Sequence, residues 1–279
     1  MIEALTPVYT AALFPELHRE LVALLRGLAP TDWERPTVAG RWRVRDVAAH
    51  LLDGDLRKVS VYRDGHALAP ERPIADYRDL VAFINALNAT GVDAARRLSP
   101  RVLVDLLEIS GGWVSELVAS LPPHEPSLFA VDWAGEARSE NWMDTGREYT
   151  ERWHHQMQIR DAVGAPGLLD RQWLVPLLDL SVRAIPRAYA GVSAAEGTAV
   201  VLEVTGGAAG RWSVVRDGTG WRVWRGGAPS PAATVRVDPD DAWRLLYNGL
   251  PAADARRRLE IVGDERLALP LLAARSVLV

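Results

Sequence analysis

The 279-residue sequence predicts an α+β protein, in which a helical bundle is followed by a smaller α+β domain. Two observations lead to this prediction. As far as about residue 190, apolar residues recur three and four positions apart, which is the spacing of one face of a helix. From Gly197 onward, short apolar runs with a period of two are separated by glycines and an Asp-Gly turn, a pattern typical of strands and hairpins. We expect residues 1–165 to form the first domain, and residues 166–279 to form a C-terminal helix and the second domain.

The first domain is expected to contain five helices, at residues 9–28, 43–65, 76–98 and 100–121 and in a segment that ends at Gly164. Ser99 and Pro100 are typical of a helix start, since serine caps the N-terminus and proline is tolerated in the first turn. Asp144 or Thr145 is the expected N-cap of the fifth helix, and Gly164 its expected C-cap. A helix at 171–189 is interrupted by prolines. The second domain then has strands near 197–206, 210–227, 233–239 and 258–264, with helices at 239–250 and 264–276.

Composition excludes several classes of function. The chain has no cysteine, so disulfides, thiolate ligands to a metal and a cysteine nucleophile are excluded. The net charge is -4 and basic residues are not clustered, so we expect no nucleic-acid partner. The N-terminus lacks the basic and apolar regions of a signal peptide, and no apolar run is long enough to span a membrane. We therefore expect a soluble, cytoplasmic protein with no membrane partner.

The segment TERWHHQMQIRDAVG, residues 150–164, contains the main candidate site. Glu151 and His155 are four residues apart, so both lie on one face of a helix and can reach one metal ion. His154 points about 100° away and is expected at the surface or the rim of the site. His18 is expected on the solvated side of the first helix. An exposed hydrogen-bonded pair is a common alternative explanation of the Glu-x-x-x-His spacing.

His50 lies in the predicted core-facing helix RVRDVAAHLLDG. A histidine on an apolar face is commonly a core residue without a ligand. In an antiparallel bundle, however, His50 can converge with a Glu/His pair from another helix. Two histidines and one carboxylate form the usual open zinc set, which leaves a position for water or substrate. Ni2+ or Fe2+ is compatible with the same set.

The segments GRWRVRDVAAHLLDGD and ERWHHQMQIRDAVG resemble the mycothiol-dependent maleylpyruvate isomerase family, within the DinB-like metalloprotein superfamily, and TDWERPT also fits this family. The resemblance implies a DinB-like four-helix bundle in which His50, Glu151 and His155 bind a divalent metal, Zn2+ by preference. The segment from 234 to 272 is similar to the family's smaller, sterol-carrier-like α+β domain. Many members have Asp where this chain has Gln158, and a neutral amide would support the basicity of His155 less well.

The resemblance also implies thiol chemistry with mycothiol as cosubstrate, and hence an isomerase or S-transferase that acts through a metal-bound thiolate on an electrophilic substrate. An anionic substrate needs arginine, for which Arg222 and Arg225 are candidates, and Trp42 and Trp153 are candidate walls of the pocket. The same site with bound water would make a metal-dependent hydrolase. A non-catalytic metal- or lipid-binding protein is a third alternative. We expect a monomer or a weak dimer.

Overall fold

The computed structural model describes residues 1–218 and 220–277. The chain forms two compact units, and we describe each by itself. The helical unit comprises residues 9–128 and 151–167, and the sheet unit comprises residues 1–8, 129–150 and 168 onward. Residues 1–8 and 129–150, which the sequence analysis placed with the first domain, are therefore part of the sheet unit.

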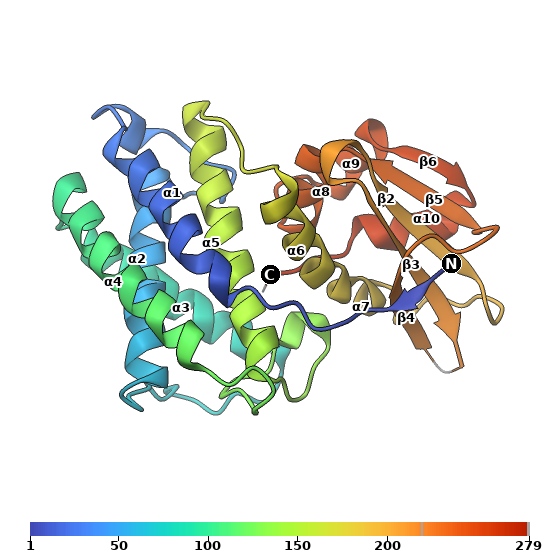
Figure 1. The fold of residues 1–279 in the computed structure, drawn as a ribbon, viewed down its shortest axis with the longest axis horizontal. Helices are drawn as coiled ribbons and strands as arrows, with labels where there is room; N and C mark the ends of the chain where they lie inside the picture. The colour runs from blue at the N-terminus through green and yellow to red at the C-terminus, as the bar shows by residue number, and fades with distance from the viewer. Residues whose placement is uncertain (219, 278–279) are drawn as a thin grey trace. The chain divides into compact units, whose positions relative to one another are not determined.

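The helical unit contains α1 (Phe14–Arg26), α2 (Val44–Tyr62), α3 (Tyr77–Ala95), α4 (Pro100–Ser120) and the second half of α5 (Asn141–Val163), as Figure 1 shows. Two 3-10 turns accompany them, η1 (Ala11–Leu13) and η2 (Asp32–Glu34). The core forms where α1, α2, α4 and α5 face one another, and its buried side chains include Leu21, Leu25, Val47, Leu51, Leu107 and Ile159. These four helices confirm the predicted bundle. Helix α3 packs against α2.

The helix ends follow the local sequence in most places. Ser99 Oγ accepts a hydrogen bond from the Val102 N–H, which confirms the predicted cap of α4. Gly164 directly follows α5 with a φ of 72°, in the left-handed region that glycine adopts without strain. The predicted start of α5 was wrong, because the helix already begins at Asn141. Asp144 lies in its first turn and accepts from Arg147 at 2.8 Å. The first helix also begins later than expected, at Phe14.

The sheet unit has six described strands in the order β1-β4-β3-β2-β5-β6. They are β1 (Glu3–Ala4), β2 (Ala199–Val204), β3 (Gly210–Asp217), β4 (Gly220–Arg225), β5 (Ala233–Val237) and β6 (Glu260–Gly263). Among the described strands, only β2 and β5 pair in parallel and every other neighbouring pair is antiparallel, so the sheet is mixed. Strand β1 was not predicted, because two residues show no period.

The described part of the sheet unit also contains the first half of α5 and five further helices: α6 (Arg171–Ser181), α7 (Ile185–Ala188), α8 (Pro239–Leu246), α9 (Ala252–Arg258) and α10 (Glu265–Leu272). Three short 3-10 turns, η3 (Asp132–Ala134), η4 (Val182–Ala184) and η5 (Gly206–Ala208), complete it. Helix α10 packs against β5 and β2. A helical bundle together with a mixed sheet and its helices confirms the predicted α+β class. Within the described ranges, no helix is both long and apolar enough to cross a membrane.

Candidate metal centre

Three side chains that could bind a metal converge inside the helical unit. His50 comes from α2, and Glu151 and His155 come from consecutive turns of α5. One ligand atom from each lies within 4.8 Å of the other two. His155 Nε2 is 3.4 Å from Glu151 Oε2, and the rings of His50 and His155 meet edge to face with their centroids 4.6 Å apart. The structure therefore brings together the three residues that the sequence analysis selected.

Gln158 determines which nitrogen of His155 faces this cluster. The Gln158 Oε1 atom lies 2.8 Å from His155 Nδ1, and an amide oxygen can only accept. The Nδ1–H of His155 therefore donates to Gln158, which leaves the lone pair of Nε2 directed toward Glu151. Gln158 is buried, so water does not compete for this hydrogen bond. The neutral amide of Gln158 thus fixes the orientation of the His155 ring, which is part of the supporting role expected at this position.

The charges of the cluster suit a cation. Burial lowers the pKa of His50 well below its usual value, and His155 nearby lowers it further, so His50 is neutral. Burial by itself raises the pKa of Glu151. The neighbouring His154 and His155 side chains outweigh that effect, and the pKa of Glu151 lies well below its usual range. One ionised carboxylate and neutral imidazole are the protonation states that a divalent metal requires.

The geometry of the three residues fits a small divalent cation. Ligand atoms about 2.0–2.1 Å from a tetrahedral zinc are about 3.3 Å apart. The 3.4 Å between His155 and Glu151 already matches this separation. The ligand atom of His50 lies within 4.8 Å of those of both other residues. In addition, His50 Nδ1 is buried and has no hydrogen-bond partner among the described residues, a costly state unless something binds there.

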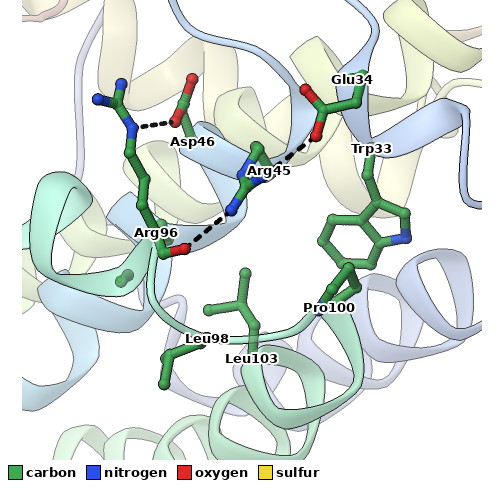
Figure 2. A pocket seen from close by; sticks show the side chains of 10 residues that line it. Trp33, Glu34, Arg45, Asp46, Arg96, Leu98, Pro100 and Leu103 are labelled. Carbon is green, nitrogen blue, oxygen red and sulfur yellow. Dashed lines mark hydrogen bonds and ion pairs between the residues drawn. The ribbon is translucent and has the colours of Figure 1, made fainter.

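Asp46 lies one turn before His50 on α2. Its Oδ2 accepts from the backbone N–H of Arg43, which caps the start of the helix. Its other oxygen, Oδ1, lies 3.4 Å from Arg96 Nε. Figure 2 shows this ion pair beside the contacts of Arg45 with Glu34 and with the Arg96 carbonyl. The cavity between them measures about 20 Å3, which holds one water molecule and no substrate.

The predicted tryptophans occupy different positions. The Trp42 ring centroid is 4.9 Å from that of His50 and 6.3 Å from that of His155, so this indole lies against the cluster. Trp153 is fully buried. It lies about 200° around α5 from Glu151, since each residue turns a helix by 100°. Trp42 therefore has the position expected of a pocket wall, whereas Trp153 faces away from the candidate ligands.

The two candidate arginines belong to the sheet unit. Arg222 lies 3.1 Å from Asp217 and is largely exposed. Arg225 forms an ion pair with Asp179, whose other oxygen accepts a hydrogen bond from the Trp212 indole at 2.9 Å. Their role in substrate binding stays a prediction.

Two other histidines were placed wrongly by the sequence analysis. His154 is 3% exposed, and its ring centroid is 4.0 Å from that of His155, so it is a buried neighbour of the cluster instead of a rim residue. His18 turns toward α4, where its Nε2 lies 3.2 Å from the Glu108 carbonyl. Both errors arise because a helical wheel gives the direction of a side chain and not what packs against it.

The sequence analysis also missed a buried ion pair between Asp55 and Arg152, to which Ser110 contributes a hydrogen bond. A signal for it exists in the sequence. The segment 152–160 contains polar residues on every side of the helix, although the whole segment is buried. A helix with no continuous apolar face in a domain core indicates polar partners on its neighbours.

Comparison with known proteins places these features in a family. The family described as mycothiol maleylpyruvate isomerase N-terminal domain matches residues 14–160, just over half of the 279-residue chain. That range includes His50, Glu151 and His155. No curated protein sequence gives a significant match.

Solved structures with similar folds cover most of the chain. A crystal structure of the mycothiol-dependent maleylpyruvate isomerase aligns with a TM-score of 0.52 and 14% identity, over 84% of this chain and 86% of that one. A histidine-to-alanine mutant of that isomerase aligns with a TM-score of 0.50 and 13% identity over the same shares. Sterol carrier protein 2 like 2 from Aedes aegypti is 23% identical over 34% of this chain and 97% of that one, with a TM-score of 0.26. The first two similarities show a shared fold.

Proposed function

Because the chain belongs to the mycothiol maleylpyruvate isomerase family through its N-terminal domain, we propose that it is a metal-dependent and thiol-dependent isomerase or S-transferase. His50, Glu151 and His155 bind one divalent ion, Zn2+ by preference, and mycothiol is the cosubstrate. The observation that carries this proposal is the convergence of two imidazoles and one carboxylate in a chain that contains no cysteine. The sulfur nucleophile must then come from a small molecule.

The residues of the cluster have separate roles in this proposal. Glu151 supplies the negative charge that balances part of the cation's charge, and its low pKa keeps it ionised. Gln158 holds the His155 tautomer that presents Nε2. The Trp42 ring beside His50 excludes water from one side. A divalent ion held by three protein ligands supplies an open position that lowers the pKa of a bound thiol.

The reaction class follows from the chemistry of a thiolate. Addition to an activated double bond, rotation about the resulting single bond and elimination of the thiol together give cis–trans isomerisation. Retention of the adduct gives an S-transferase. An anionic electrophile would need arginine, and Arg222 and Arg225 remain the candidates for that contact.

Metal content tests the ligand set. We expect one equivalent of divalent metal in the purified protein, and loss of that metal in His50→Ala and His155→Ala. His66→Ala is the matched control, because His66 is exposed in a loop outside the cluster, and this variant should keep its metal. Circular dichroism verifies that each variant is folded. Unchanged metal content in a folded His155→Ala variant would remove His155 from the site.

Calorimetric titration of mycothiol tests the thiol dependence. The metal-loaded protein should bind mycothiol, and the metal-free protein and the His50→Ala variant should not. A thiol-dependent change in a cis electrophile such as maleylpyruvate would then identify the isomerase. A metal-loaded protein that binds no mycothiol would contradict the thiol chemistry. Hydrolysis of an ester or amide by that protein would instead favour the hydrolase, because water can occupy the same open position.

A further inference from the structure

Helix α4 carries a row of exposed apolar side chains that the helical unit leaves uncovered. The row has four members, whose exposed fractions are 43% for Val102, 39% for Leu106, 52% for Ile109 and 42% for Trp113. The opposite side of the same helix is buried in the core through Leu103, Val104, Leu107 and Val114. Figure 1 shows α4 at the outer edge of the helical unit. We call the four exposed residues the α4 seam.

The spacing of the α4 seam is that of a coiled-coil contact. Its members are four, three and four residues apart, which places them at alternating d and a positions of a heptad. The next positions in the same pattern are polar and exposed, namely Ser99 before the seam and Glu116 after it. The apolar row therefore has defined ends and is about 17 Å long, at 1.5 Å per residue. Four large apolar side chains on one exposed helix face mark an interaction site more often than a solvated surface.

We propose that the α4 seam is the contact surface of a symmetric dimer, in which two copies of this chain pack their α4 helices antiparallel. In that arrangement, every residue at heptad position a faces a residue at heptad position d of the other copy. Leu106 then lies opposite Ile109 of the second copy, and Val102 lies opposite Trp113. Each pair occurs twice because a two-fold axis relates the copies. The seam is thus complementary to itself, with the largest side chain facing one of the smallest.

The charges at the two ends of the seam favour pairing with a second copy of the chain, and they favour the antiparallel direction over the parallel one. Arg101 and Glu116 are exposed, and neither forms an ion pair with any residue that the structure describes. The antiparallel pairing places Glu116 of one copy at the N-terminus of the other α4, beside Arg101. A helix N-terminus attracts negative charge, so both contacts are favourable. Parallel packing would instead place Glu116 beside Glu116 and Arg101 beside Arg101.

The acidic residues next to the seam do not oppose this contact. Asp105 and Glu108 are both held by Arg26 from α1. The Arg63 guanidinium lies over one face of the Trp113 ring, 5.7 Å from its centroid. A single pair of helices buries less surface than a standard stable interface. The dimer is therefore weak and depends on protein concentration.

Sedimentation velocity of the metal-loaded 279-residue protein tests the proposal, over concentrations from about 1 µM to 1 mM, which span weak affinities. The mass should rise reversibly from the 30.6 kDa of one chain toward twice that value. Ile109→Glu should raise the dimer dissociation constant by at least tenfold. Leu68→Glu is the matched control, because Leu68 is an exposed apolar residue in a loop outside the seam, and it should leave the dissociation constant unchanged. A wild-type protein that stays monomeric throughout, or a dimer insensitive to Ile109→Glu, would overturn the proposal.

A charge exchange tests the antiparallel direction. Arg101→Glu and Glu116→Arg should each weaken the dimer, since each places like charges together at both ends of the seam. The double variant should restore the wild-type dissociation constant, because it exchanges the two charges and each contact still joins a positive side chain to a negative one. Two single variants that weaken the dimer without restoration in the double variant would refute the antiparallel pairing.

Discussion

The ion pair between Asp55 on α2 and Arg152 on α5 offers a quantitative test of how the helical unit is held together. Only 1% of the Asp55 side chain and 6% of the Arg152 side chain are exposed to solvent. Ser110 on α4 donates a hydrogen bond of 2.8 Å to the other carboxylate oxygen, so three helices meet at Asp55. Arg152→Met keeps most of the apolar stem and removes the charge. We predict that this variant is strongly destabilised.

The magnitude follows from what remains after the substitution. Breaking a buried ion pair costs about 3–5 kcal/mol, and here the buried Asp55 carboxylate loses its contact with the Arg152 guanidinium. Ser110 still donates to Asp55, which places the expected loss toward the lower end, about 3 kcal/mol. In the double variant Arg152→Met with Asp55→Asn, neither charge of this pair remains and Ser110 keeps an acceptor. Its loss should be smaller, about 1 kcal/mol.

Urea unfolding followed by far-UV circular dichroism measures these differences, with the transitions of the helical signal fitted separately if more than one appears. The control is Arg63→Met, which removes an exposed arginine from its pair with Asp64. We expect no measurable shift of its midpoint, because water screens that pair. If Arg152→Met were no more destabilising than Arg63→Met, or the double variant less stable than Arg152→Met alone, the cost assigned to breaking this buried ion pair would be refuted.

Two further predictions concern packing and metal affinity. Gly111→Ala should destabilise the helical unit by about 1–3 kcal/mol, because a Cβ there would lie 2.0 Å from the His18 ring. Gly112→Ala, whose new Cβ would meet no atom of another element within 4 Å, should instead stabilise α4 by up to about 1 kcal/mol, and the two unfolding curves compare the outcomes directly. Gln158→Leu should weaken metal binding by about 10–100-fold, since it removes the acceptor for His155 Nδ1, whereas Gln158→Glu keeps an acceptor and should retain or tighten binding. Competition with a chelator measures both affinities, and equal affinities for the two variants would exclude the orienting role of Gln158.

The class and order of the elements could be predicted because they depend on local periodicity. The period of 3.6 marked the helices and the period of two marked the strands from residue 199 onward. Element ends depend on tertiary contacts as well, and were less accurate. Helix α5 extends back to Asn141 past the expected cap at Asp144, whose carboxylate accepts a hydrogen bond from Arg147. Strand β1 consists of two residues whose only signal is their pairing with β4.

The candidate site was predictable in part for the same reason. Four-residue spacing places Glu151 and His155 on one face of any helix, whatever surrounds it. Whether His50 lies beside them depends on how α2 and α5 pack. Periodicity carries no information on that packing, so the position of His50 was predicted from the family resemblance. The burial of His154 required knowledge of the neighbours of α5. No pattern within the helix carries that information.

The polar interior of α5 explains why the cluster can be well ordered. Gln156 donates to the Leu17 carbonyl at 3.1 Å, and Arg160 reaches Glu20 at 2.8 Å, so two side chains bind α1 at defined points. Arg152 does the same toward α2 through Asp55. An apolar stripe tolerates small rotations of a helix, whereas buried polar groups lose their partners when the helix turns. We infer that these contacts determine the rotation of α5. They therefore hold Glu151 and His155 toward His50 before any ligand binds, which is the preorganisation that a metal site on a rigid scaffold requires.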